Sequence, residues 1–93
     1  MRPSRWLFLV DADGLHDAAM RTLAPFAVHG AVLARLDLQR VGDGVRLRIE
    51  AEGVDDIRAG ALQRKLGGLP FVRSVSLGWV SAEGAAAPPE GPR

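Results

Sequence analysis

Apolar and polar positions change period several times along the chain, and each period predicts an element. Residues 6–10 form a short continuous apolar run, which is typical of a strand in the middle of a sheet. From 16 to 29 the apolar residues recur at spacings of three and four, which predicts a helix ended by Gly30. Residues 31–41 alternate, which predicts a strand. Its apolar face is expected to hold Val32, Ala34, Leu36 and Leu38, and its more polar face Leu33, Arg35, Asp37 and Gln39.

The second half of the chain continues with a hairpin, a helix and a strand. A Gly-Asp-Gly turn at 42–44 leads into another alternating run at 45–52, which predicts a β-hairpin. We expect a second helix to begin at Asp55 or Asp56, because a carboxylate suits a helix N-terminus. A last strand is expected over 72–79. The buried stripe of the second helix is expected to contain Ile57, Ala61, Leu62, Leu66 and Leu69.

The resulting order, β-α-β-β-α-β, predicts an α+β fold of the ferredoxin-like class. Right-handed crossovers place both helices on one face of a four-stranded antiparallel sheet, with the first and third strands in the middle. We expect residues 5–81 to form this domain, and the Ala/Pro/Gly segment 82–93 to be disordered because it has no large apolar residue. The strand at 31–41 is then an edge strand, whose unpaired backbone groups can pair with a second subunit.

Composition narrows the functional classes. The chain has 93 residues and no cysteine, which limits it to one domain without disulfides or thiolate metal sites. His16 and His29 are too few for a histidine-rich metal cluster, and we expect no metal or cofactor. The net charge of +1 does not indicate nucleic-acid binding. The apolar runs are too short for a membrane span or a signal peptide, so a cytoplasmic protein is expected.

The turn Asp11-Ala12-Asp13-Gly14 is the main candidate for chemistry. It resembles the opening motif of haloacid-dehalogenase-like phosphatases, but Leu15 stands where that motif has Thr or Ser, and the chain is too short for their parallel sheet. Main-chain N–H groups at the start of a helix also bind carboxylates well, and Asp11 or Asp13 could accept an ammonium group, which together suit a free amino acid. The simpler interpretation is that Asp13 caps the helix and Gly14 makes a turn.

Three segments carry a resemblance to a known family: the turn at 11–15, the helix end at 23–30, and the second helix with its exit at 57–75. They resemble the ACT domain, a small amino-acid-sensing module, and the exit is similar to that of acetolactate synthase small subunits. The resemblance implies a non-catalytic domain that binds an amino-acid effector, regulates a large catalytic biosynthetic subunit, or keeps only a structural role as an interaction subunit. The implied effector-binding residues are Asp11, Asp13, Gly14, Leu15 and Gly30.

Association into a homodimer is the other expectation, because so short a chain builds only a thin core. If Trp6, Phe8 and Val10 face the helices, the leucines between them lie on the open sheet face, where an apolar strip suits contact with another subunit. That face lacks exposed aromatic residues that stack on bases, so no RNA partner is expected. The expected interface residues are Leu7, Leu9, Val32, Leu33, Arg35 and Asp37.

Overall fold

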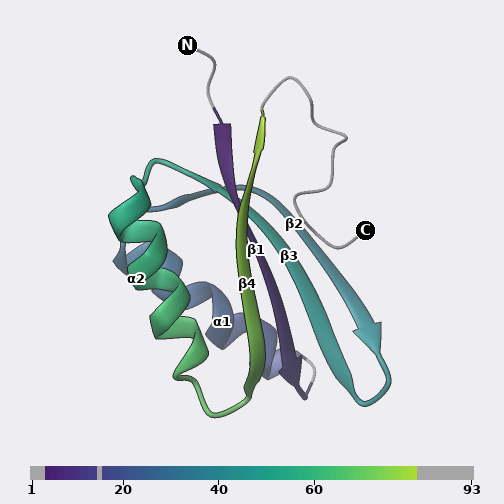
Figure 1. Ribbon diagram of the computed structural model, residues 1–93. Helices are drawn as coiled ribbons and strands as arrows, with labels where there is room; N and C mark the ends of the chain where they lie inside the picture. Colours follow the sequence, from purple (N-terminus) through teal and green to yellow (C-terminus); the bar gives the residue numbers. More distant parts are fainter. Residues whose placement is uncertain (1–3, 15, 82–93) are drawn as a thin grey trace.

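The computed structural model describes residues 4–14 and 16–81, whose elements follow the predicted order (Figure 1). Leu15 and the segment 82–93, for which we expected an effector contact and disorder, lie outside the described residues. Within the described part, no helix is long and apolar enough to cross a membrane. The elements are β1 (Ser4–Asp13), α1 (His16–Val28), β2 (Val32–Val41), β3 (Gly44–Glu52), α2 (Asp56–Gly67) and β4 (Val72–Ser81).

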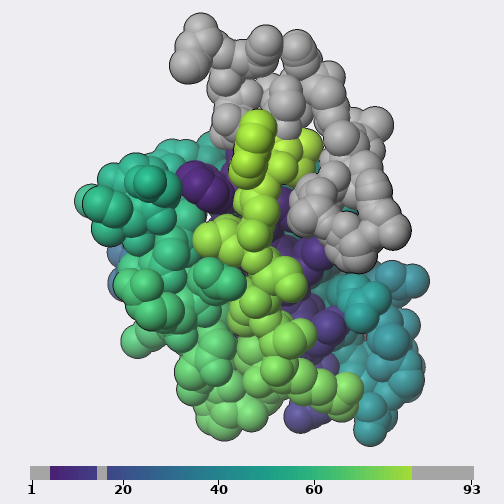
Figure 2. Space-filling view, viewed as in Figure 1, coloured from purple at the N-terminus to yellow at the C-terminus, as the bar shows by residue number. Residues whose placement is uncertain are grey.

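The four strands form one antiparallel sheet in the order β2-β3-β1-β4, and both helices lie on the same face of it (Figure 1). β1 and β3 occupy the middle, as predicted, and β2 and β4 are the edges. In the space-filling view, the surface of α2 lies directly against β4 (Figure 2). The structure therefore confirms the ferredoxin-like α+β fold class.

The core lies between the middle strands and the helices. Phe8, Val10 and Ala12, alternate residues of β1, are buried in this layer as the period-two pattern predicts. The ring of Phe26 in α1 meets the ring of Phe8 edge-on, with the two centroids 4.9 Å apart and the planes at 85°. Such an edge-to-face pair contributes about 0.5–1.5 kcal/mol beyond the area that it buries. This contact fixes α1 over the middle of the sheet.

α2 begins after Asp55, whose carboxylate accepts a hydrogen bond of 2.8 Å from the main-chain N–H three residues later. The expected buried stripe is wrong at Ile57, whose side chain is 76% exposed. At about 100° per residue, Ile57 lies nearly opposite the residues that α2 buries. Those buried residues are Ala59, Leu62 and Leu66.

β2 is exposed along its whole length. Its register against β3 shifts between Leu33 and Arg35, so the simple alternation predicted for this strand breaks there. Leu33 and Leu36 both pair with core residues of β3 and lie on the helix side of the sheet, whereas Val32 pairs with Glu52 on the opposite side. The prediction that Val32 shares one face with Leu36 is therefore wrong, because the sequence pattern does not reveal the bulge.

We expect Phe26→Ala to lower the free energy of unfolding by about 3–5 kcal/mol, because it empties the space against Phe8 and removes the aromatic pair. Urea denaturation followed by circular dichroism measures this loss. Val28→Ala is the matched control on the same helix, because that side chain is 81% exposed and its loss should change stability by less than about 0.5 kcal/mol. Equal effects of the two substitutions would contradict this description of the core.

Candidate functional site

The turn from β1 into α1 is the site that the sequence singled out. β1 ends at Asp13, and Gly14 follows with φ of +87°, a backbone conformation that residues with a side chain rarely adopt. A Cβ added to Gly14 would lie 3.7 Å from the Cβ of Ala18, an ordinary contact. The backbone angle rather than lack of space is therefore what requires glycine at this position.

Asp11 is bound to the sheet rather than free for a ligand. Arg46 of β3 donates a hydrogen bond of 2.7 Å from its Nε to one carboxylate oxygen, and the Ser74 hydroxyl of β4 donates one of 3.2 Å to the other. The hydrogen bond from Arg46 lowers the pKa of the Asp11 carboxyl below its ordinary value, against the opposing effect of partial burial. Asp11 is therefore ionised and links β1 to the strands on both sides of it.

Asp13, two residues further along β1, is held in a similar way. Its carboxylate forms an ion pair with Arg73 of β4, which also donates a hydrogen bond of 3.2 Å to Asp43 in the hairpin turn. The main-chain N–H of Asp13 donates to the carbonyl of Phe71 at 2.7 Å. The hydrogen bonds that Arg73 donates to Asp13 and Asp43 raise the pKa of its guanidinium above the ordinary value, so Arg73 stays positively charged in this network.

The alternation of β1 places both carboxylates on the sheet face that carries no helix, as their partners on β3 and β4 show. An ammonium group at Asp11 or Asp13 would compete with the arginine that each carboxylate already binds. What the turn offers without rearrangement is the N-terminus of α1, where main-chain N–H groups lack helical partners.

Gly30 lies at the other end of α1, with φ of +76°. α1 has 13 residues, so about 20 Å of helix separates Gly30 from Gly14 within one chain. The structure therefore does not bring the expected effector-binding residues together in a single subunit.

The expected interface residues differ in their exposure to solvent: those of β1 are buried or half-buried, and those of β2 are exposed. Leu7 is only 1% exposed although it lies outside the core between sheet and helices, and its place in an interface with a second subunit stays a prediction. Its cross-strand neighbours are Glu50, itself buried, and Gly78, and Leu9 is half-buried. On β2, by contrast, Val32 and Leu33 are exposed, and Arg35 donates to Asp37 at 3.0 Å on the outer surface.

The helix side of β2 carries a feature that the interface prediction missed. Leu33, Leu36 and Leu38, which we call the β2 strip, lie on this side, and 40–49% of each side chain is exposed. The spacing of Leu36 and Leu38 was visible in the sequence, but Leu33 was expected on the opposite face, because the pattern does not show the register shift that brings it to this side. α1 packs on β1 through Phe26 and covers the strip only in part.

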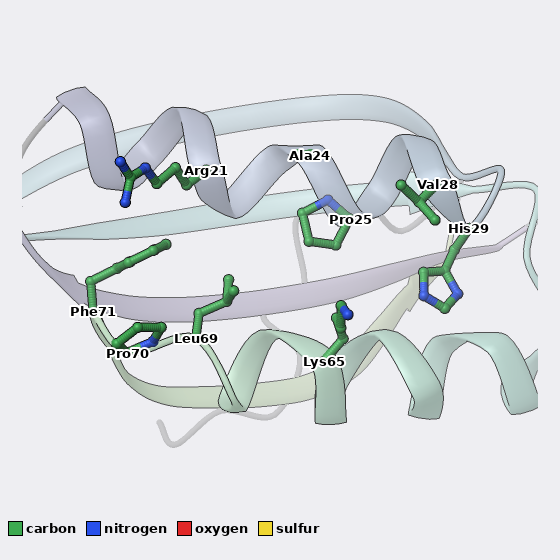
Figure 3. A pocket seen from close by; sticks show the side chains of 9 residues that line it. All are labelled: Arg21, Ala24, Pro25, Val28, His29, Lys65, Leu69, Pro70 and Phe71. Carbon is green, nitrogen blue, oxygen red and sulfur yellow. The ribbon is translucent and has the colours of Figure 1, made fainter.

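A groove between α1 and α2 was also missed (Figure 3). It has a volume of about 490 Å³. Its lining residues on α1 are spaced by three and four, as on one face of a helix. The sequence does not show that α2 leaves this face of α1 uncovered. The lining residues are Arg21, Ala24, Pro25, Val28, His29, Lys65, Leu69, Pro70 and Phe71.

The phosphatase alternative loses its structural basis. Its motif requires a parallel sheet, and every strand pair in residues 4–14 and 16–81 is antiparallel. Asp11, the residue that would be the nucleophile, is held by Arg46 and Ser74. Among the described residues, no group of three or more His, Asp or Glu side chains is placed to hold a metal ion.

No protein-family model matches the chain, and no curated protein matches its sequence. The solution structure of the C-terminal domain of the MgtC protein from Mycobacterium tuberculosis is similar in fold, with a TM-score of 0.68, 18% identity, and coverage of 89% of this chain and 92% of that chain. The crystal structure of the ACT domain from GTP pyrophosphokinase of Chlorobium tepidum gives a TM-score of 0.69, 8% identity, and coverage of 83% and 99%. At these identities the likeness shows the fold alone, and that fold is ACT-like.

The ion pair of Asp11 predicts a pH-dependent contribution to stability. Because the pKa of Asp11 is lowered in the folded chain, its contribution is present above the unfolded pKa and is lost as the pH falls through the folded pKa. We expect Asp11→Asn to lower the urea midpoint at about pH 7, and the loss to shrink as the pH falls below the unfolded pKa of Asp11. In an Arg46→Gln background, the effect at the higher pH should shrink. An effect of Asp11→Asn that does not vary with pH would contradict the assignment.

Proposed function

We propose that this chain is a non-catalytic ACT-like regulatory domain that binds an amino-acid effector at the β1–α1 turn or regulates a partner biosynthetic enzyme. The observation that carries the proposal is the combination of the ACT-like sheet order with a glycine-dependent turn, Gly14, directly before α1. The main-chain N–H groups at the start of α1 would receive the effector's carboxylate. The effector's ammonium group would replace Arg46 or Arg73 at Asp11 or Asp13.

The second candidate is an association module in which the ligand site has been lost. The ion pairs of Asp11 with Arg46 and of Asp13 with Arg73 favour it, because they satisfy the carboxylates that an ammonium group would need. The chain would then act by assembly, with a second copy of itself or with a large catalytic subunit of a biosynthetic enzyme.

Both candidates involve a homodimer, and β2 is the edge that suits one. An antiparallel pairing of two β2 strands about a two-fold axis at Leu36 would place Arg35 of one copy opposite Asp37 of the partner subunit, and the reverse. Opposite charges directly across a strand pair are favourable. The same pairing would bring the two β2 strips side by side, which would remove apolar surface from water.

We expect isothermal titration with the common amino acids to show binding that is abolished by Gly14→Leu, because a leucine at φ of +87° distorts the turn. Gly42→Leu is the matched control, since Gly42 has φ of +60° in the hairpin turn with no atom within 4 Å of an added Cβ. It carries a similar backbone strain but should leave binding intact. An absence of heat with all twenty amino acids would remove the effector role and leave the association module.

Sedimentation velocity tests the β2 pairing. The unmodified chain should form a dimer, and Arg35→Asp should weaken it because two carboxylates then face each other across the axis. Adding Asp37→Arg to that variant should restore the dimer, because the charges are again complementary. Arg64→Asp, an equal charge change on the exposed side of α2, should have no effect. A monomeric wild-type chain, or a dimer insensitive to Arg35→Asp, would contradict the pairing.

A further inference from the structure

The groove between α1 and α2 has an apolar floor that residues 4–14 and 16–81 leave open. Pro25 is buried at its base, and Leu69 and Phe71 are half-buried beside it. Val28 on its wall is 81% exposed. Figure 3 shows Lys65, Leu69 and Phe71 projecting from the α2 side toward α1, so both sides of the groove contribute to one surface. Its volume of about 490 Å³ lies within the range of small-molecule sites.

The charges around this floor all have one sign. Arg21 and Lys65 are the two charged side chains among the nine lining residues, and none of the nine is acidic. Arg21 has an ion pair of 3.3 Å with Asp17 one turn earlier, and both side chains are mostly exposed. An exposed pair of this kind contributes little in water, so Arg21 can exchange this partner for a ligand at small cost. In the part of the chain that the structure describes, no carboxylate lies within 4.0 Å of the Lys65 ammonium group.

We propose that this groove binds an amphiphilic carboxylate: a small molecule with an apolar body, one carboxylate and no ammonium group. The apolar body lies on Pro25, Leu69 and Phe71, and the carboxylate meets Lys65 or Arg21, where a charge-assisted hydrogen bond is stronger than a neutral one. Amines and zwitterionic amino acids are disfavoured, because no acidic side chain lines the groove to receive an ammonium group. The proposal does not depend on an effector at the β1–α1 turn. An effector there would need an ammonium group, whereas the groove disfavours one.

A matched set of probes separates the head group from the apolar body. We would titrate the full chain, labelled with ¹⁵N, with 4-phenylbutyrate, 4-phenylbutanamide and 4-phenylbutylamine. The carboxylate should shift the amide signals of Ala24, Val28 and Lys65, the amide should do so more weakly, and the amine should not. A shift of the Asp13 amide signal would not distinguish the groove from the turn, because this N–H at the turn is hydrogen-bonded to the carbonyl of Phe71, which lines the groove. Equal binding of amine and carboxylate, or shifts confined to β2, would overturn the proposal.

Two substitutions locate the site. Lys65→Glu should weaken 4-phenylbutyrate binding about tenfold or more, because it replaces the cation with a repelling charge. Arg64→Glu, the same change at the neighbouring exposed position outside the groove, should leave the affinity within about twofold. Ala24→Trp should block the groove by filling it from an exposed position on α1. Circular dichroism verifies that each variant is folded, and unchanged binding in both Lys65→Glu and Ala24→Trp would refute the assignment.

Discussion

The contact between Phe8 of β1 and Phe26 of α1 determines how the rest of this small domain is arranged. It sits in the central layer of the core and fixes α1 above the two middle strands. α2 then packs against β4, on the other half of the same face (Figure 1). α1 reaches only part of β2, so Leu33, Leu36 and Leu38 on the helix side of that strand stay 40–49% exposed. The exposure of the apolar residues of β2 thus follows from the position in which the aromatic pair holds α1.

The same arrangement explains why the apolar surface has two separate parts. On one side of α1 lies the β2 strip, which is long and linear and borders a row of free backbone groups. On the other side lies the groove against α2, which is concave and flanked by Arg21 and Lys65. A linear strip on a free strand edge suits another strand, whereas a concave site with cations suits a compact anionic molecule. Shape and charge therefore assign different kinds of partner to the two surfaces.

The order of elements and the burial of β1 could be predicted from the sequence, because periods of two and about 3.6 are properties of each segment alone. The bulge at Leu33–Arg35 could not, since nothing in the local pattern shows which residue leaves the register. For the candidate site, the sequence located the acidic turn but not the arginines that neutralise it. Arg46 and Arg73 lie 35 and 60 residues from the aspartates that they bind.

The turn and the groove are joined by one main-chain hydrogen bond, from the Asp13 N–H to the Phe71 carbonyl at 2.7 Å. Phe71 lines the groove, and Asp13 ends β1 at the turn. A ligand that moves the backbone at Phe71 therefore also moves the end of β1, and with it the ion pair between Asp13 and Arg73. Coupling of this kind is reciprocal: whatever one ligand does to the affinity of the other, the second does equally to the first.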